Sequence, residues 1–366
     1  MAFKTPLLEY KAWAYKNGNH PIELIQETVN LVKSANGEYI APDGKILIKI
    51  NYASLNPVDY KLYKAKPAFL SLINSKQGFG KDYSGQVVSI GKNTATKVKV
   101  GDLVQGIQAP MLDRGSCAEY LLLDPTKSPI ATKATNIDLA HAASFPLVLG
   151  TAMQISKGLK ITGEKILILG AGTSVGRYAV QLCRLKGAKE IVTTNSGKNE
   201  ELIRELGATS QIDYRKNPNI LQQVLESVKE SGPFDHILDT VGGKELFPEI
   251  KTILKKGGAY HTTNPGSSTF AFLASTLKKK WAAWGFLGYD YSFGFLDYNG
   301  GWIDTARDLV QDGKVKIFID SVYPFNDLHA AVEKLNSGRA QGKILLEVEK
   351  PTKEEELEET RQGTQL

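Results

Sequence analysis

A short glycine-rich run near the middle of the chain has the composition of a phosphate-binding loop. Gly170, Gly172 and Gly176 follow the apolar stretch 165–169 and begin a helical pattern over 175–186. The N–H groups at the start of a helix are unpaired and carry partial positive charge, so a diphosphate binds well there. A dinucleotide would contact Gly170, Thr173, Ser174, Val175 and Gly176; the alternative is a glycine-rich structural turn.

The next apolar stretch, residues 190–194, ends in polar side chains that bear on the choice of cofactor. A site that selects NAD usually has an acid here, which accepts from the ribose 2′-hydroxyl. The first acid after this stretch is Glu200. Ser196 and Lys198 stand instead where a 2′-phosphate would lie, and Tyr214 and Arg215 end the next apolar stretch along the chain, which together favours NADPH. The alternative for Lys198 is a solvated residue in the first turn of a helix.

Apolar stretches and helical patterns alternate from about residue 160. Such repeats pair their strands in parallel with right-handed crossovers, which predicts a doubly wound Rossmann sheet of the α/β class. Two of its strands end near Thr240 and Thr262, and these residues are candidate cofactor contacts because ligands lie outside the carboxyl ends of parallel strands. Pro248 should kink or shorten the helix expected over 244–257.

The first third of the chain predicts a separate β-rich domain, with strand patterns punctuated by Gly and Pro. The last strand pattern, "GKILLEVE", should return to this domain. We therefore expect a catalytic domain over 1–145 and 315–350, and a cofactor domain over 146–314. The acid-rich residues 351–366 should form a disordered tail.

Composition excludes several functional classes. The 366 residues are 42% hydrophobic and 23% charged, with a net charge of +6 and no dense basic cluster, so nucleic acid is not an expected partner. Two cysteines, Cys117 and Cys183, give no disulfide framework and fit a reducing compartment. The N-terminus lacks the apolar core of a signal peptide, and no apolar window could span a bilayer. We expect a cytoplasmic protein.

Several runs together resemble the medium-chain dehydrogenase/reductase superfamily. They are "ASLNPVDYKLY", "GFGKDYSGQVV", "KVKVGDLVQGI", "GSCAEYLLL", "AASFPLVLGTAMQ", "FDHILDTVGG" and "GKILLEV". The sequence is most similar to the zinc-independent, quinone oxidoreductase-like branch, over about residues 40–348. That branch has the longer glycine spacing seen here, although Thr173 and Ser174 replace two of its glycines. The resemblance implies a GroES-like catalytic domain beside the Rossmann domain.

The resemblance also implies roles for single residues. Asn56 would lie near the nicotinamide ribose, Thr151 would touch the carboxamide, and Lys343 would approach the cofactor. Lys61 would stabilise charge on the substrate oxygen or donate a proton, unless it is a surface lysine. Asp82 would orient Lys61 or Lys81, or cap a turn; Tyr60 and Tyr63 are nearby alternatives to Lys61 as the donor.

We expect no metal. Zinc-dependent relatives have a cysteine ligand in the region of residues 56–60 and a Gly-His-Glu run, where this chain has "NPVDY" and Gly80-Lys81-Asp82. Catalytic zinc needs three protein ligands such as cysteine or histidine, and an open fourth position. Without zinc, alcohol dehydrogenation is disfavoured, and quinones or α,β-unsaturated carbonyl compounds are easier hydride acceptors.

The segment 270–298 departs from the family and is dense in aromatic residues around Lys278, Lys279 and Lys280. It would pack in the core, form an apolar wall over a bulky substrate, pair with a second copy in a homodimer, or contact a lipid surface. Fungal members similar to this pattern include proteins associated with lipid particles and stress responses. The leading hypothesis is an NADPH-dependent quinone or enone reductase. The alternative is a non-catalytic NADPH-binding scaffold or sensor on a lipid-droplet or membrane surface.

Overall fold

The computed structural model describes residues 5–65, 76–109, 113–264, 269–294, 296–298 and 301–351, with only the backbone of 269–273. The chain divides into two compact units. One combines residues 1–147 with 298–366, and the other is residues 148–297. Apart from Pro351, the expected tail lies outside the described residues.

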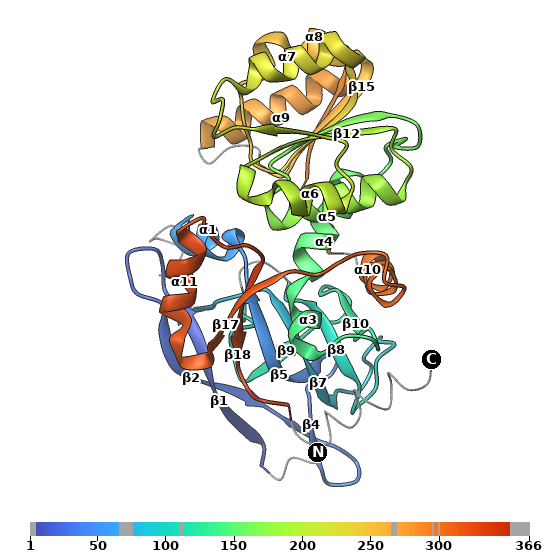
Figure 1. The fold of residues 1–366 in the computed structure, drawn as a ribbon. Coiled ribbons are helices and arrows are strands. Elements are labelled where there is room, and N and C mark those ends of the chain that lie inside the picture. Colours follow the sequence, from blue (N-terminus) through green and yellow to red (C-terminus); the bar gives the residue numbers. More distant parts are fainter. Residues whose placement is uncertain are drawn as a thin grey trace. The chain divides into compact units, whose positions relative to one another are not determined.

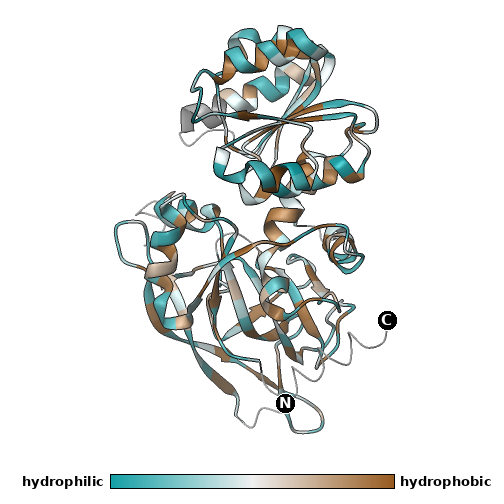
Figure 2. Cartoon of the chain, viewed as in Figure 1, coloured by the Kyte–Doolittle hydropathy of each residue, from teal (hydrophilic) through white to brown (hydrophobic). Residues whose placement is uncertain are grey.

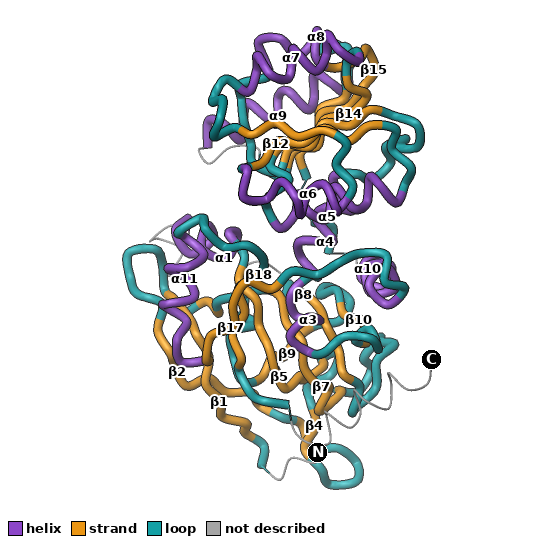
Figure 3. The backbone as a smooth tube through the Cα atoms, viewed as in Figure 1, coloured by secondary structure: helices purple, strands orange, loops and turns teal. Residues whose placement is uncertain are grey.

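The unit of residues 148–297 contains a six-stranded parallel sheet in the order β13-β12-β11-β14-β15-β16 (Figures 1 and 3). Helices α5 and α6 cover one face and α7 to α9 the other (Figure 3). This is the expected Rossmann arrangement. Successive strands are added toward one edge from β11 to β13 and toward the other edge from β14 to β16, so the strand order reverses between β11 and β14. The strands are β11 (Lys165–Leu169), β12 (Glu190–Asn195), β13 (Ser210–Asp213), β14 (Phe234–Asp239), β15 (Leu254–Thr262) and β16 (Asp290–Phe293).

Two of the longer helices of this unit, α5 and α7, are amphipathic. Figure 2 shows hydrophilic and hydrophobic stretches alternating along α7, whose buried Val224 faces the core. The central strand β11 is buried throughout, as expected of a parallel strand covered on both faces. The helices are α4 (Pro146–Ile155, which begins in the other unit), α5 (Ser174–Leu185), α6 (Glu200–Leu206), α7 (Ile220–Ser231), α8 (Ile250–Ile253) and α9 (Thr269–Ala283), with 3₁₀ turns η1 (Gly197–Asn199) and η2 (Phe247–Glu249).

The other unit is mainly β-structure, as the sequence predicts. Its largest sheet has the order β10-β8-β7-β5-β18-β17, with β9 also pairing with β5. β18 pairs antiparallel with β5, so the last strand does return to the first domain. The strands are β1 (Leu7–Tyr15), β2 (Glu23–Asn30), β3 (Val32–Lys33), β4 (Tyr39–Ile40), β5 (Ile46–Leu55), β6 (Gln77–Gly78), β7 (Asp82–Ile90), β8 (Leu103–Ile107), β9 (Tyr120–Leu123), β10 (Ile130–Thr132), β17 (Ile319–Pro324) and β18 (Lys343–Glu347).

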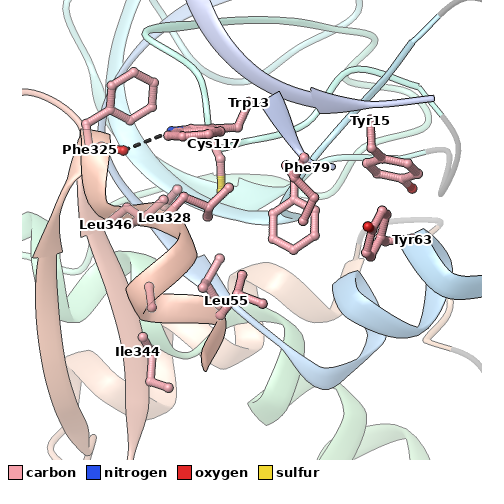
Figure 4. Packing of buried hydrophobic residues seen from close by; sticks show 14 residues of the cluster. Trp13, Tyr15, Leu55, Tyr63, Phe79, Cys117, Phe325, Leu328, Ile344 and Leu346 are labelled. Atoms are coloured by element: carbon pink, nitrogen blue, oxygen red, sulfur yellow. Dashed lines mark hydrogen bonds between the residues drawn. The ribbon is translucent and has the colours of Figure 1, made fainter. Parts of the chain in front are cut away.

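An aromatic and aliphatic core joins distant parts of this unit (Figure 4). The indole N–H of Trp13 donates to the carbonyl of Phe325 over 2.8 Å, which ties β1 to the C-terminal segment. Leu55, Leu328 and Leu346 are fully or almost fully buried in the same core. The helices are α1 (Pro57–Ala65), α3 (Leu139–Ser144), α10 (Gly301–Gln311) and α11 (Leu328–Asn336), with the 3₁₀ turn η3 (Phe325–Asp327).

Two expected boundaries differ from the structure. The second boundary between units lies at 297/298 rather than 314/315. The boundary lies earlier because helix α10 packs beside β10 and therefore belongs to the β-rich unit. The side-chain amide of Asn136 donates to the carbonyl of Val310 in α10 over 3.2 Å. The helix expected over 244–257 is shortened, as expected from Pro248, to η2 and the four-residue α8. Its last part is wrong, because strand β15 begins at Leu254.

Candidate functional site

The glycine loop between β11 and α5 leaves no room for side chains. Gly170 has a positive φ of 81°, which other residues rarely adopt. A Cβ on Gly176 would lie 2.2 Å from the Gly170 carbonyl oxygen, and one on Gly172 would lie 2.6 Å from the Asn199 amide nitrogen. The glycines therefore let the helix start and the turn after β12 pack directly against the loop, in a cradle that fits a diphosphate.

Thr173 caps α5. Its hydroxyl accepts from the N–H of Gly176 over 2.9 Å and contacts the Thr240 hydroxyl at 3.0 Å. Thr240 in turn donates to the Leu169 carbonyl over 2.8 Å. Both threonines therefore hold the loop in shape. The half-buried residues Ser174 and Val175 begin the helix, and their N–H groups are those a helix start leaves without intrahelical partners.

The turn after β12 and the end of β13 carry the residues expected to distinguish NADPH from NADH. Ser196 is 7% exposed and Lys198 is exposed in the turn. Tyr214, which is 42% exposed, directly follows β13. Parallel pairing of β12 with β13 sets Asn195 opposite Asp213. A Cβ on Gly197 would lie only 2.8 Å from the Asp213 carboxylate. The fold thus places the acid Asp213 beside this turn, although Asp213 belongs to the neighbouring strand β13 and not to the sequence that follows β12.

The ends of β14 and β15 are held together by a buried carboxylate. One oxygen of Asp239 accepts from the N–H groups of Val241 and Gly242, and the other accepts from Tyr260 at 2.8 Å and Thr262 at 3.1 Å. Burial raises the pKa of Asp239, and these hydrogen bonds oppose the rise. Thr262 is therefore buried, and its hydroxyl donates to Asp239 and helps to position that carboxylate. The expected Thr151 is half-buried on α4.

In the β-rich unit, Asn56, Asp82 and Lys343 form one buried polar cluster. The Lys343 ammonium donates to the side-chain oxygen of Asn56 at 2.5 Å, to Asp82 at 3.0 Å and to the Leu55 carbonyl at 3.1 Å. The amide of Asn56 donates to Asp82 at 2.9 Å. Lys343 is 4% exposed and Asp82 is fully buried. Charge and hydrogen bonding together fix the orientation of the Asn56 side chain.

These contacts bear on two expectations. Asp82, which was expected to orient Lys61 or Lys81 or to cap a turn, pairs with Lys343 through one oxygen, and its other oxygen accepts from the Leu147 N–H at the start of α4 over 2.8 Å. Lys343 is buried and donates to three groups of its own unit, so its expected contact with the cofactor stays a prediction. Lys61 is exposed on α1 and is not part of this cluster.

A second buried pair, Asp59 and Lys81, lies next to Asn56. One oxygen of Asp59 accepts from the Asn56 N–H over 2.7 Å. Its other oxygen and the Lys81 ammonium are buried without a hydrogen-bond partner in the described part of the chain. Burial raises the pKa of Asp59 to about 7, against the lowering effect of Lys81. Burial also lowers the pKa of Lys81.

The sequence contains a signal for Asp59 that the predicted site does not include. Asn56 and Asp59 have the spacing of a capping box, in which the fourth residue accepts from the N–H of the cap. Arg177 and Asn199 were also missed. Both are buried, and their side chains are joined by a hydrogen bond of 3.3 Å.

The residues at the position of the relatives' zinc do not fit that metal. Asn56, Asp59 and Lys81 offer no thiolate or imidazole, and Asp82 is already bonded to the buried ammonium of Lys343. Over the described ranges, no group of three or more His, Cys, Asp and Glu side chains could ligate an ion. None of the described helices has the length and apolar character to cross a bilayer.

Comparison with known proteins agrees with this geometry. The family model of the alcohol dehydrogenase GroES-like domain matches residues 42–132, and that of a zinc-binding dehydrogenase matches 206–346. Protein YIM1 of Vanderwaltozyma polyspora is 30% identical over 93% of this chain and 100% of its own length. The chain belongs to the medium-chain dehydrogenase/reductase superfamily. Within it, the chain belongs to the quinone oxidoreductase-like branch.

Other relatives of this superfamily member are similar over nearly the whole chain. Protein YIM1 of Saccharomyces cerevisiae strain S288c is 27% identical, over 92% of this chain and 98% of the relative. A quinone oxidoreductase from Coxiella burnetii superposes with a TM-score of 0.74 and is 26% identical, over 93% of this chain and 100% of the other. The protein is thus an oxidoreductase by family, and the fold of that family binds a nicotinamide cofactor.

Proposed function

We propose that the protein is an NADPH-dependent reductase of quinones or α,β-unsaturated carbonyl compounds that works without zinc. The observation that carries this proposal is the glycine cradle at the start of α5, where a side chain on Gly172 or Gly176 would collide with its surroundings. Such a cradle suits a dinucleotide diphosphate. The similarity to a quinone oxidoreductase of Coxiella burnetii supports the substrate class.

The protein's own residues divide the work between cofactor and substrate. The N–H groups of Ser174 and Val175 bind the diphosphate, and Ser196, Lys198 and Tyr214 bind the 2′-phosphate. Thr151 contacts the carboxamide. When bound, the nicotinamide supplies a hydride to the electron-poor carbon of the substrate.

In the other unit, Asp82 and Lys343 hold the buried Asn56 side chain in one orientation. In this proposal its amide hydrogen-bonds the nicotinamide ribose. The substrate oxygen gains negative charge, and Lys61 or solvent supplies the proton. Asn56 and Lys81 stand where zinc-dependent relatives have metal ligands, and neither offers a thiolate or an imidazole. In this proposal, hydrogen-bond donors therefore stabilise the negative charge on the substrate oxygen.

The experiment is turnover of the purified full chain with NADPH and a panel of quinones and enones. We expect substrate-dependent NADPH oxidation that a chelator leaves unchanged. Asn56→Ala should lower kcat, because the oriented amide is lost. Turnover that requires stoichiometric zinc would contradict the metal-free mechanism, and tight NADPH binding without turnover on any substrate would favour the second candidate.

The second candidate is an NADPH-binding scaffold or sensor that contacts lipid. It is favoured by an exposed apolar patch formed by Leu277, Trp281, Trp284 and Phe286, which are 48%, 44%, 66% and 73% exposed. Lys279 and Lys280 are exposed beside it. Aromatic residues flanked by lysines suit an anionic lipid surface. Under this candidate function, the protein would be cytoplasmic, and part of its population would be bound to lipid droplets or membranes.

Binding to anionic vesicles tests this candidate. Sedimentation with the wild type, but not with a Trp284→Ser/Phe286→Ser variant, would support it. The patch also precedes the edge strand β16, so loss of a homodimer in the variant would assign the surface to a second copy instead.

A further inference from the structure

Arg177 is a buried cation in an unusual place. It is only 1% exposed and is the bulkiest of the fully buried side chains among the described residues. It is the fourth residue of α5, directly after Gly176. The start of a helix is its positive end, where a cation is unfavourable. A buried arginine is stable here only where hydrogen bonds or an opposite charge compensate it.

The contacts of Arg177 lead to the turn after β12. Its guanidinium donates to the side-chain oxygen of Asn199 over 3.3 Å. The amide nitrogen of Asn199 donates to the Ser196 hydroxyl over 3.4 Å. The same nitrogen is the atom that a Cβ on Gly172 would meet at 2.6 Å. Asn199 thus lies between the glycine loop and the turn, and Arg177 holds it.

This chain of contacts joins two places where phosphate is expected. The glycine loop and the start of α5 form the diphosphate cradle. Ser196 and the exposed Lys198 form the turn expected to bind the 2′-phosphate. Two phosphate groups of one cofactor would therefore lie on either side of Asn199, and both would be attracted by the buried charge of Arg177.

We propose that Arg177 is a positioning residue for cofactor selection: it holds Asn199, and through it the Ser196 hydroxyl, in the geometry that accepts the 2′-phosphate of NADPH. The inference rests on the proposed NADPH dependence. A neutral ribose hydroxyl gains much less than a phosphate from a buried cation, so the effect of Arg177 should fall mainly on NADPH.

The test compares dissociation constants for NADPH and NADH in the wild type, Arg177→Met and Arg177→Lys. For Arg177→Met we expect the preference for NADPH over NADH to fall on the order of tenfold, the change that losing one hydrogen bond to a charged group produces. Arg177→Lys should recover part of the preference, because it keeps the charge without the planar geometry. Arg184→Met, at the exposed end of the same helix, is the matched control and should leave the preference unchanged.

The outcomes separate this inference from the proposed function. A wild type that binds both cofactors equally would overturn the proposed NADPH dependence, and the inference with it. A wild type that prefers NADPH, together with an Arg177→Met variant of unchanged preference, would overturn the inference alone. If Arg177→Met does not fold, Asn199→Ala breaks the same link. Retained preference in that variant overturns the inference, and lost preference supports it.

Discussion

At the scale of single residues, Lys343 has the clearest energetic role. Its ammonium is 3.0 Å from the fully buried carboxylate of Asp82, so neither charge is stable there alone. Lys343→Met should lower the free energy of unfolding by about 3–5 kcal/mol, the usual cost of leaving one member of a buried pair. Urea denaturation measures this.

The matched variant for that experiment is Lys343→Met/Asp82→Asn, which removes both charges. It should lose less stability than the two single variants summed, because no uncompensated charge remains. Strict additivity would show that the two charges do not interact.

Asp59 gives the stability a defined pH dependence. Burial raises its pKa from the ordinary 3.8 to about 7, so between these values the folded protein holds a proton that the unfolded chain has released. The contribution of Asp59 to stability is therefore fully present below about pH 4 and is lost as the pH rises to about 7.

Asp59→Asn removes this titration and can still accept from the Asn56 N–H. Its stability relative to the wild type should rise with pH across that window, by up to about 1.4 kcal/mol per pH unit. Urea denaturation of both proteins between pH 4 and pH 8 measures the difference. A difference that stays constant with pH would refute the raised pKa.

Asp213 should oppose NADPH binding. Its carboxylate lies beside Gly197, where it would repel a 2′-phosphate bound by Ser196 and Lys198. Asp213→Asn keeps the hydrogen bond that the side chain accepts from the Arg215 N–H. We expect tighter NADPH binding with little change for NADH. Fluorescence titration measures this, and weaker NADPH binding would place the 2′-phosphate elsewhere.

At the scale of elements, the start of α5 depends on Gly176. An added Cβ would lie 2.2 Å from the Gly170 carbonyl oxygen, so the loop must move in Gly176→Ala. Affinity for the dinucleotide should fall on the order of tenfold or more, about 1.4 kcal/mol per tenfold. The control is Gly301→Ala, where a Cβ has nothing within 4 Å and which should bind normally. Equal affinity in both variants would remove the loop from the site.

The elements that the sequence predicted best are those with strong local patterns. β11 is apolar after its first residue, Lys165, and α5 follows it with a helical pattern, so the sequence predicts both to within a residue or two. The last part of the helix expected over 244–257 failed because pairing with β14 draws Leu254 into β15. Local propensity could not reveal that tertiary contact.

At the scale of the whole molecule, the fold class could be predicted because β-α alternation begins near residue 160. The discontinuous β-rich domain could be predicted because a final strand pattern follows that alternation and was expected to pair in the first domain, as β18 does with β5. The site was predicted only in part. Lys343 and Asp82 are 261 positions apart, and no spacing rule could pair them. In the sequence, Arg177 is an ordinary helical residue, and its burial and its contact with Asn199 emerge from the fold.

The proposed function depends most on NADPH binding by the start of α5 together with the turn after β12 and Tyr214 at the end of β13. The direct measurement is titration of the purified full chain with NADPH and NADH, repeated on Lys198→Ala and Tyr214→Ala. We predict saturable binding of both cofactors, tighter for NADPH, with that preference reduced in both variants. No binding of either cofactor would contradict the cradle, and equal affinity for the two would contradict the 2′-phosphate site.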